Sequence, residues 1–303
     1  MTATPHASAR DADTATEVFV AHRNLLFTVA YEMLGSAADA EDVLQETWLK
    51  WTGVDLARVR DRRAYLVRIT TRLALTRMRT LGRRKESYVG AWLPEPLATA
   101  ADVAEDVELA ESVSMAMLLV LETLSPTERA VFVLREVFAV GYEEIAEAVG
   151  KSPAAVRQLA HRARGHVSAR RPRSAAASDE AQRALEAFRR AVDTGDLQGL
   201  FDVLAPDVVL IGDGGGLAQA APKPVVGAAK VGRLLASGLW HLPEIGTLAP
   251  ARVNGHPALV LRRGDEVDTV VALRIDDGLV TGLYGVRNPE KLSRISGETV
   301  LTR

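Results

Sequence analysis

The sequence predicts a multidomain protein with an all-α N-terminal half and an α+β C-terminal domain. Two observations support this fold class. Between about residues 17 and 85, Gly and Pro are scarce and apolar residues recur at helical spacing. Beyond about residue 174, one helix is followed by short apolar stretches separated by Gly, Asp and Asn turns. A length of 303 residues leaves room for two or three domains.

Composition narrows the classes of protein that the chain can represent. A hydrophobic content of 48% is that of a globular protein. The absence of cysteine excludes disulfides, cysteine-based zinc sites and a thiol nucleophile, and six scattered histidines predict no metal site. The N-terminus lacks the apolar core of a signal peptide, and no apolar run is long enough to span a membrane. We therefore expect a cytoplasmic protein.

The first helical part offers an acidic surface. Residues 35–39 form a capping signal, and the helix after them carries AEDVLQETWLKW. One face is predicted to be core, with Ala40, Val43, Leu44, Thr47, Trp48 and Trp51. The opposite face carries Asp42, Gln45, Glu46 and Leu49. Acidic faces are usually only solvated, but a leucine among carboxylates also fits a docking surface for a basic protein partner.

The next helix is strongly basic. Between Arg58 and Lys85, eleven Lys or Arg residues stand against a single acid, Asp61, which is placed to cap the helix. Three apolar side chains are predicted to point inward, namely Leu66, Ile69 and Leu73. The outer stripe around Leu75 suits a phosphate backbone and consists of Arg68, Arg72 and Arg79. A solvated basic helix is the alternative, although such helices usually interleave Glu for pairing.

The stretch from Ser125 to Arg173 predicts a helix-turn-helix. Ser125 and Glu128 form a capping box, a short helix then ends at Gly150, and Ser152-Pro153 starts another helix. The last helix has an apolar face of Val156, Leu159, Ala160, Ala163 and Val167. Its other side carries Arg157, Gln158, His161, Arg162 and Arg164, and residues 151–173 include seven Lys or Arg and no acid. Such a helix can bind base edges and phosphates in the major groove, and the alternative is a helical hairpin with a solvated basic face.

We divide the chain into four segments: 1–90, a linker at 91–110 with the sequence WLPEP and an acidic run, the helix-turn-helix module at 111–173, and 174–303. The strands expected in the last segment are DVVLIGD, HPALVLRR, DTVVALRI and GLVTGLYGV, with a helix around 227–239. Two basic surfaces joined by a linker imply two contacts on one nucleic acid.

An acidic helix, a basic helix, a linker and a helix-turn-helix in this order resemble a bacterial sigma factor of the extracytoplasmic-function type. The resemblance covers about residues 17–171. It implies a factor that binds core RNA polymerase, at the beta-prime clamp and beta flap, and directs initiation at promoter DNA. The clamp-facing residues implied are Asp39, Glu41, Asp42, Gln45 and Trp48, beside Glu46 and Leu49 of the acidic face. Those implied for the minus-thirty-five element are Arg157, Gln158, His161 and Arg162.

Three motifs narrow the resemblance to sigma factors with a C-terminal SnoaL-like domain, a cone of curved strands closed by helices. They are WLPEP in the linker, DGGG after a strand, and NPEKL near the C-terminus. In that subgroup the extra domain is thought to regulate activity in cis. Leu217 follows the glycines where the family usually has Lys, so no role of that lysine carries over.

We expect the linker to pack against the C-terminal domain, because an exposed tryptophan flanked by prolines tends to find a groove. The linker residues are Trp92, Leu93, Pro94, Glu95 and Pro96. The expected contact residues on the domain are Asp213, Gly214, Gly215, Gly216, Asn288, Pro289, Glu290, Lys291 and Leu292.

The alternative function is a DNA-binding module fused to a domain that binds or transforms a small molecule, as cyclases and isomerases of this fold do. Polar residues that could line a cone cavity are Asp213, His241, Arg274 and Tyr284. Asp213 before three glycines is more often a turn residue, and no Gly-Lys-Ser/Thr follows to make a phosphate loop. We therefore expect no enzyme activity, no cofactor and no catalytic residue. The acidic docking helix favours the sigma-factor interpretation, since an enzyme fusion has no need of it.

Overall fold

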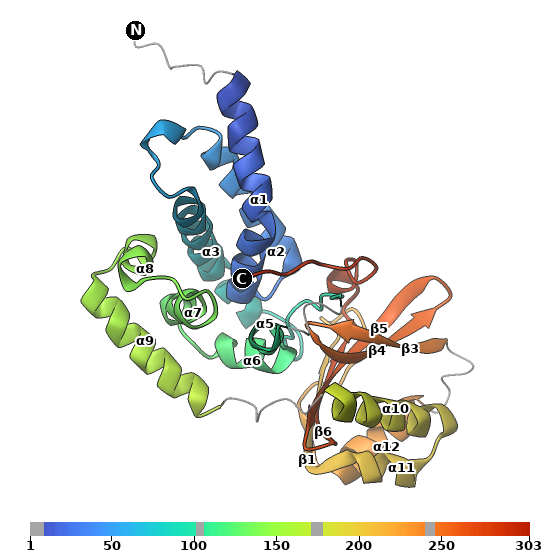
Figure 1. Ribbon diagram of the computed structural model, residues 1–303. Helices are drawn as coiled ribbons and strands as arrows, with labels where there is room; N and C mark the ends of the chain where they lie inside the picture. Colours follow the sequence, from blue (N-terminus) through green and yellow to red (C-terminus); the bar gives the residue numbers. More distant parts are fainter. Residues whose placement is uncertain (1–8, 101–105, 171–177, 240–245) are drawn as a thin grey trace. The chain divides into compact units, whose positions relative to one another are not determined.

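The computed structural model describes residues 9–100, 106–170, 178–239 and 246–303, which form two compact units (Figure 1). Unit 1 comprises residues 1–83, 121–169 and 301–303, and unit 2 comprises residues 84–120 and 170–300. The stretch 84–120 therefore groups with the C-terminal domain. Within the described ranges, no helix is both long and apolar enough to cross a membrane.

Unit 1 is built from helices, several of which begin at capping residues that the sequence shows. Its elements are α1 (Ala9–Leu34), α2 (Ala37–Trp51), the 3-10 turn η1 (Leu56–Arg58), α3 (Arg62–Glu86), α7 (Pro126–Phe132), the π-helical turn η2 (Val133–Val137), α8 (Tyr142–Val149) and α9 (Pro153–Ser168). Ser36, Ser125 and Ser152 accept hydrogen bonds from backbone N–H groups as N-caps. Gly150 ends α8 in the left-handed conformation with φ 68°. The predicted helix-turn-helix is confirmed.

The core of unit 1 is apolar, with one buried cation. Leu26, Leu66 and Trp51 are fully buried, and the Trp51 indole donates to the carbonyl of Ala15 at 2.9 Å. Arg129 of α7 is only 2% exposed, and its Nε donates to the carbonyl of Glu32 at 2.8 Å. Its Nη1 also pairs with Glu122 at 2.6 Å. Because a buried charge is costly unless paired, these bonds fix α7 against the end of α1.

Unit 2 contains a six-stranded sheet in its described residues, with the order β2-β1-β6-β5-β4-β3. The strands are β1 (Leu204–Asp213), β2 (Val225–Val226), β3 (Thr247–Val253), β4 (His256–Arg263), β5 (Glu266–Asp276) and β6 (Leu279–Val286). β1 and β6 pair in parallel, and the other neighbours are antiparallel. All four predicted strands are confirmed, whereas β2 and β3 were not predicted. The 3-10 turn η3 (Pro289–Lys291) follows β6.

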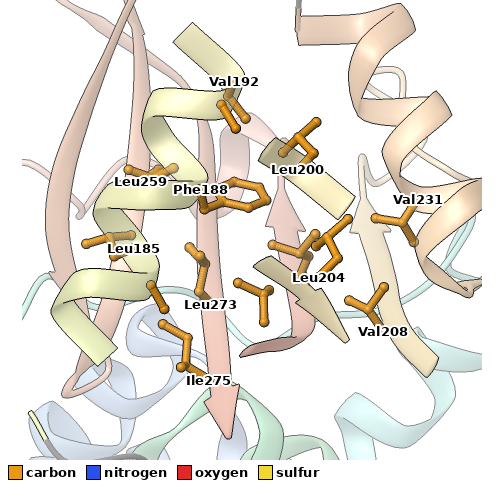
Figure 2. Close-up of a cluster of buried hydrophobic side chains, with 14 of the residues drawn as sticks. Leu185, Phe188, Val192, Leu200, Leu204, Val208, Val231, Leu259, Leu273 and Ile275 are labelled. Atoms are coloured by element: carbon orange, nitrogen blue, oxygen red, sulfur yellow. The ribbon is translucent and has the colours of Figure 1, made fainter. Parts of the chain in front are cut away.

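One face of this sheet is covered by α10 (Ser178–Thr194), α11 (Leu197–Val203) and α12 (Ala228–Leu239) (Figure 1). Figure 2 shows how Leu185 and Phe188 of α10 meet Leu259 and Leu273 of the strands. These side chains are nearly fully buried, so the described interior of the cone is filled by apolar packing. The all-α half and the α+β C-terminal domain are both confirmed.

The opposite face of the sheet packs against the linker. This second cluster joins Leu93, Met115 and Ala116 to the strand residues Val260 and Tyr284. Met115 and Ala116 begin α6 (Met115–Glu122), which follows α5 (Val107–Val113). The sheet thus has two apolar faces, and Leu93, Met115 and Ala116 complete the core on one of them.

Candidate functional site

The acidic surface of α2 has an exposed part and a paired part. Gln45, Glu46 and Leu49 are exposed, Leu49 to 65%, while the core side of the helix is buried as predicted except for Trp48. Trp48 is half-buried and its ring lies 5.2 Å from that of Phe19. The exposed leucine among acids is the feature of α2 that suits a protein partner.

Three carboxylates of α2 make ion pairs within unit 1. Asp39 is buried and accepts from Arg77 Nε at 2.7 Å, and Asp42 accepts from Arg77 Nη2 at 2.5 Å. The hydrogen bond to Asp39 raises the pKa of Arg77. Glu41 pairs with Arg23 at 2.8 Å. These pairs hold α2 against α3 and α1, so Asp39 is structural as well as a candidate contact residue.

The basic stripe of α3 also has paired residues and an exposed one. Arg68 pairs with Glu147 at 2.7 Å, and Arg72 Nη2 donates to the carbonyl of Glu147 at 2.7 Å. Arg79 is exposed. The position of Leu75 on the outer stripe was wrong, since Leu75 is 6% exposed and belongs to the core. Two of the three candidate arginines therefore contact the last turn of α8, whose carbonyls and carboxylate attract cations.

The last helix of the helix-turn-helix, α9, presents its polar side to solvent. The predicted apolar face is buried, and the exposed residues are Arg157, Gln158, His161, Arg162 and Arg164. Glu128 lies 3.5 Å from Arg162, and its pKa is lowered chiefly by the hydrogen bond from Ser125. Pairs at the surface are weak, so this side of α9 can exchange them for phosphates.

The linker packs into unit 2 around one buried carboxylate. Asp213, at the end of β1, is fully buried. Its Oδ1 accepts from the Tyr88 hydroxyl at 2.5 Å and from the Gly215 N–H at 3.1 Å. Its Oδ2 accepts from the Leu93 N–H at 2.9 Å and from Lys291 Nζ at 2.7 Å. Because Lys291 also donates to the carbonyl of Leu93 at 2.6 Å, WLPEP, DGGG and NPEKL meet at this point.

Aromatic rings cover the lysine of this network. Lys291 Nζ lies 3.4 Å from the centre of the Trp92 ring and 4.9 Å from that of Tyr88. Burial lowers the pKa of Lys291 to about 8, against the opposing effect of Asp213. Burial, together with the hydrogen bond to Asp213, raises the pKa of Tyr88. Asn288 Nδ2 donates to the Tyr88 hydroxyl at 2.8 Å.

The other predicted contact residues fall into two groups. Leu93, Pro94, Glu95, Pro96, Gly214 and Leu292 are buried, and Trp92 is half-buried rather than exposed. Gly216, Pro289 and Glu290 are exposed. Gly215 has φ 60°, and a side chain there would overlap Asn288 and approach Tyr88. The glycine is thus required both by its backbone conformation and by the close approach of the linker.

Comparison with known proteins supports the order of these surfaces. The Sigma-70 region 2 family matches residues 18–84, and the Sigma-70, region 4 family matches residues 114–167. The chain is 36% identical over 295 residues to the ECF RNA polymerase sigma factor SigJ of Mycobacterium tuberculosis, across 91% of this chain and 92% of the relative. The chain belongs to the extracytoplasmic-function RNA polymerase sigma factors.

Two further similarities extend along the whole sigma factor. It is 32% identical over 292 residues to the probable ECF RNA polymerase sigma factor SigI of M. tuberculosis, across 94% of this chain and 97% of that one. The crystal structure of M. tuberculosis SigJ matches with a TM-score of 0.75 and 34% identity, over 92% of this chain and 99% of that chain. The match includes the C-terminal SnoaL-like domain.

Sequence reasoning missed a second contact of the linker in this sigma factor. Asn254 and Gly255 form the turn between β3 and β4, and Asn254 is fully buried. Its side chain bonds to the backbone of Leu97 and of Val113. An Asn-Gly pair between two apolar stretches signals a turn, but no sequence signal says that the turn is covered.

The described polar residues considered for catalysis lie at two places in unit 2. Asp213 is engaged by the linker, and His241 lies outside the described residues. Arg274 and Tyr284 line a cavity of about 40 Å³ on the linker side of the sheet, with Met115 and His256.

Proposed function

We propose that this sigma factor binds the beta-prime clamp and beta flap of core RNA polymerase and directs it to promoters through α3 and α9, in the cytoplasm where polymerase works. The SnoaL-like domain regulates this activity in cis through the docked linker. The factor performs no bond chemistry of its own. The observation that carries the proposal is the order of three surfaces along one chain: the exposed side of α2, the basic helix α3 and the exposed side of α9.

The assignment of polymerase contact rests on Gln45, Glu46 and Leu49. They are exposed on α2, and no hydrogen bond or ion pair within the described residues occupies Glu46. An exposed leucine ringed by acidic and amide side chains suits a basic protein surface with an apolar centre. Asp39 and Glu41 contribute indirectly, by fixing the helix through Arg77 and Arg23.

Regulation in cis is supported by the burial of the linker. Trp92 lies over the ammonium group of Lys291, and the Leu93 backbone bonds to both members of the Asp213–Lys291 pair, so the linker covers this pair. A buried pair that depends on a docked segment favours one position of that segment over others. Residues 84–120 connect the two DNA-contacting parts, so holding them affects both.

Run-off transcription with purified core polymerase and a promoter of the gene's own operon tests this function. We expect a specific transcript that depends on the added factor. In a pull-down with the same core polymerase, Glu46→Lys should reduce capture at least about tenfold. A lysine at this position would face a basic partner surface, and like charges opposed across an interface cost several kcal/mol. Glu298→Lys is the control, since Glu298 is exposed and lies in unit 2.

Two outcomes would contradict the proposal. A factor that captures polymerase but yields no transcript from any candidate promoter would remove the initiation function. Equal capture by the folded Glu46→Lys and Glu298→Lys variants would remove α2 as the docking surface.

A further inference from the structure

Asn254 is a turn residue that the fold buries completely. It lies between β3 and β4 with φ 54°, and Gly255 follows with φ 73°. Two successive positive φ values match the two-residue hairpin turn that Asn-Gly prefers. Turn residues normally face water, where their polar side chains are solvated. A fully buried asparagine at this position needs partners for its amide.

The amide of Asn254 binds two points of the linker that are far apart in sequence. Its Oδ1 accepts from the Leu97 N–H at 2.9 Å, and its Nδ2 donates to the Val113 carbonyl at 2.8 Å. Its backbone N–H also donates to the Leu97 carbonyl at 2.9 Å. Leu97 and Val113 are themselves buried. One side chain therefore joins two points of the linker that are 16 positions apart in the sequence.

The rest of the turn contacts the linker at Thr99 and Ala110. The Gly255 N–H donates to Thr99 Oγ1 at 2.9 Å, and the Thr99 N–H donates to the Arg252 carbonyl at 3.1 Å. A Cβ on Gly255 would lie 2.8 Å from that of Ala110, so this residue must be glycine for packing as well as for its φ. His256 Nε2 donates to the Ala110 carbonyl at 3.1 Å. The turn is shaped to hold the linker.

We propose that Asn254 is a positioning residue that sets the reach of the connection between the two DNA-contacting parts of the factor. The inference rests on the proposed function and deepens its regulation in cis. A free chain of the about 16 residues from Leu97 to Val113 extends to roughly 50 Å. With both ends bound to one amide, this stretch adds almost nothing to the distance that the connection between the two DNA-contacting parts can bridge. Loss of the amide removes two of the hydrogen bonds that hold this stretch, which loosens the connection and makes promoter elements at several spacings accessible.

Two substitutions separate the two hydrogen bonds. Asn254→Gly keeps the left-handed backbone and deletes the side-chain amide, so it removes the hydrogen bonds to the Leu97 N–H and to the Val113 carbonyl. Asn254→Asp tolerates the same backbone, keeps an acceptor for Leu97 and loses the donor to Val113. Asp277→Gly is the matched control, because Asp277 begins the equivalent turn between β5 and β6 with φ 51° and is exposed.

The first readout is hydrogen exchange in the full-length protein. We expect the Leu97 amide to exchange at least about tenfold faster in Asn254→Gly, since its buried acceptor is gone. In Asn254→Asp it should stay protected. The amides of Val260 and Val270, in the sheet, should be unchanged in both variants and report that the domain is folded. Unchanged protection of Leu97 in folded Asn254→Gly would overturn this role of the Asn254 amide.

The second readout is run-off transcription on promoters whose spacer between the two elements is varied one base pair at a time. Wild type and Asp277→Gly should transcribe only near one spacer length, and both Asn254 variants should accept a wider range. A spacer profile identical to wild type would overturn the positioning role. No transcript from wild type at any spacing would instead count against the sigma function itself.

Discussion

At the scale of single residues, Asp213 shows what the motifs achieve. One carboxylate accepts from a phenol, two backbone N–H groups and an ammonium group, at 2.5 to 3.1 Å. A fully buried ion pair contributes little net stability, because desolvation offsets the attraction. We infer that its effect is specificity, since a linker in any other position takes the Tyr88 hydroxyl and the Leu93 backbone away from Asp213 and Lys291. The sequence indicated that the motifs meet, but not that the glycine loop carries a buried charge.

We predict that the pKa of Lys291 reports linker docking. Burial lowers it to about 8 from 10.5, and Trp92 supplies part of that burial. The docked form therefore releases the proton first, and docking is favoured further as the pH rises from about 8 towards 10.5. An NMR titration of the Lys291 Nζ nitrogen should give a midpoint near 8 in wild type and a higher one in Trp92→Ala. A midpoint at 10.5 in wild type would show that the network is open in solution.

At the scale of elements, local signals predicted most of the fold. Side-chain caps and a glycine stop predicted α2, α7, α8 and α9, and period-two runs predicted β4, β5 and β6. β3 was not predicted because it contains Pro250 and its apolar residues do not alternate. The proline is tolerated because β3 lies at the edge of the sheet. The parallel pairing of β1 with β6 joins distant segments, and no local pattern encodes it. Leu75 was misplaced because arginines recur on several sides of α3, so the basic residues do not mark one face of the helix.

Within unit 1 we predict that α8 restrains the DNA-binding arginines of α3. Glu147→Gln removes the ion pair with Arg68 while Arg72 keeps its carbonyl partners. An exposed pair is worth about 0.2–1 kcal/mol, so the free protein should bind duplex DNA about 1.4- to fivefold more tightly at low salt. Fluorescence anisotropy with a labelled duplex measures this.

Glu143→Gln is the matched control for that experiment. It changes the net charge equally on the same helix, and its side chain has no arginine partner among the described contacts. Equal gains from Glu143→Gln and Glu147→Gln would mean that charge alone is responsible, and the restraint by α8 would be excluded.

At the scale of the whole molecule, the functional segments predicted from the sequence and the compact units of the structure have different boundaries. The predicted segments follow the surfaces along the sequence, whereas the compact units place residues 84–120 with the C-terminal domain. The physical reason is the second apolar face of the sheet, which Leu93, Met115 and Ala116 complete. Composition marked this stretch as a linker because it is rich in Pro and acid. Its burial depends on a face formed by strands more than a hundred residues later, which composition cannot reveal.

Removal of the chain after Arg173 therefore affects the linker more than unit 1. We expect the truncated factor to keep a folded unit 1 and to capture core polymerase, since the deletion removes only residues 301–303 from that unit, among them the buried Leu301. Leu93, Leu97 and Met115 lose their cover, so the stretch 84–120 should become sensitive to limited proteolysis. Promoter output should differ from that of the full-length factor.

Trp92→Ala should then change run-off transcription in the full-length protein and have little effect in the truncated one, because the indole acts by covering Lys291. Equal effects of Trp92→Ala in both backgrounds would show that the linker acts without the C-terminal domain.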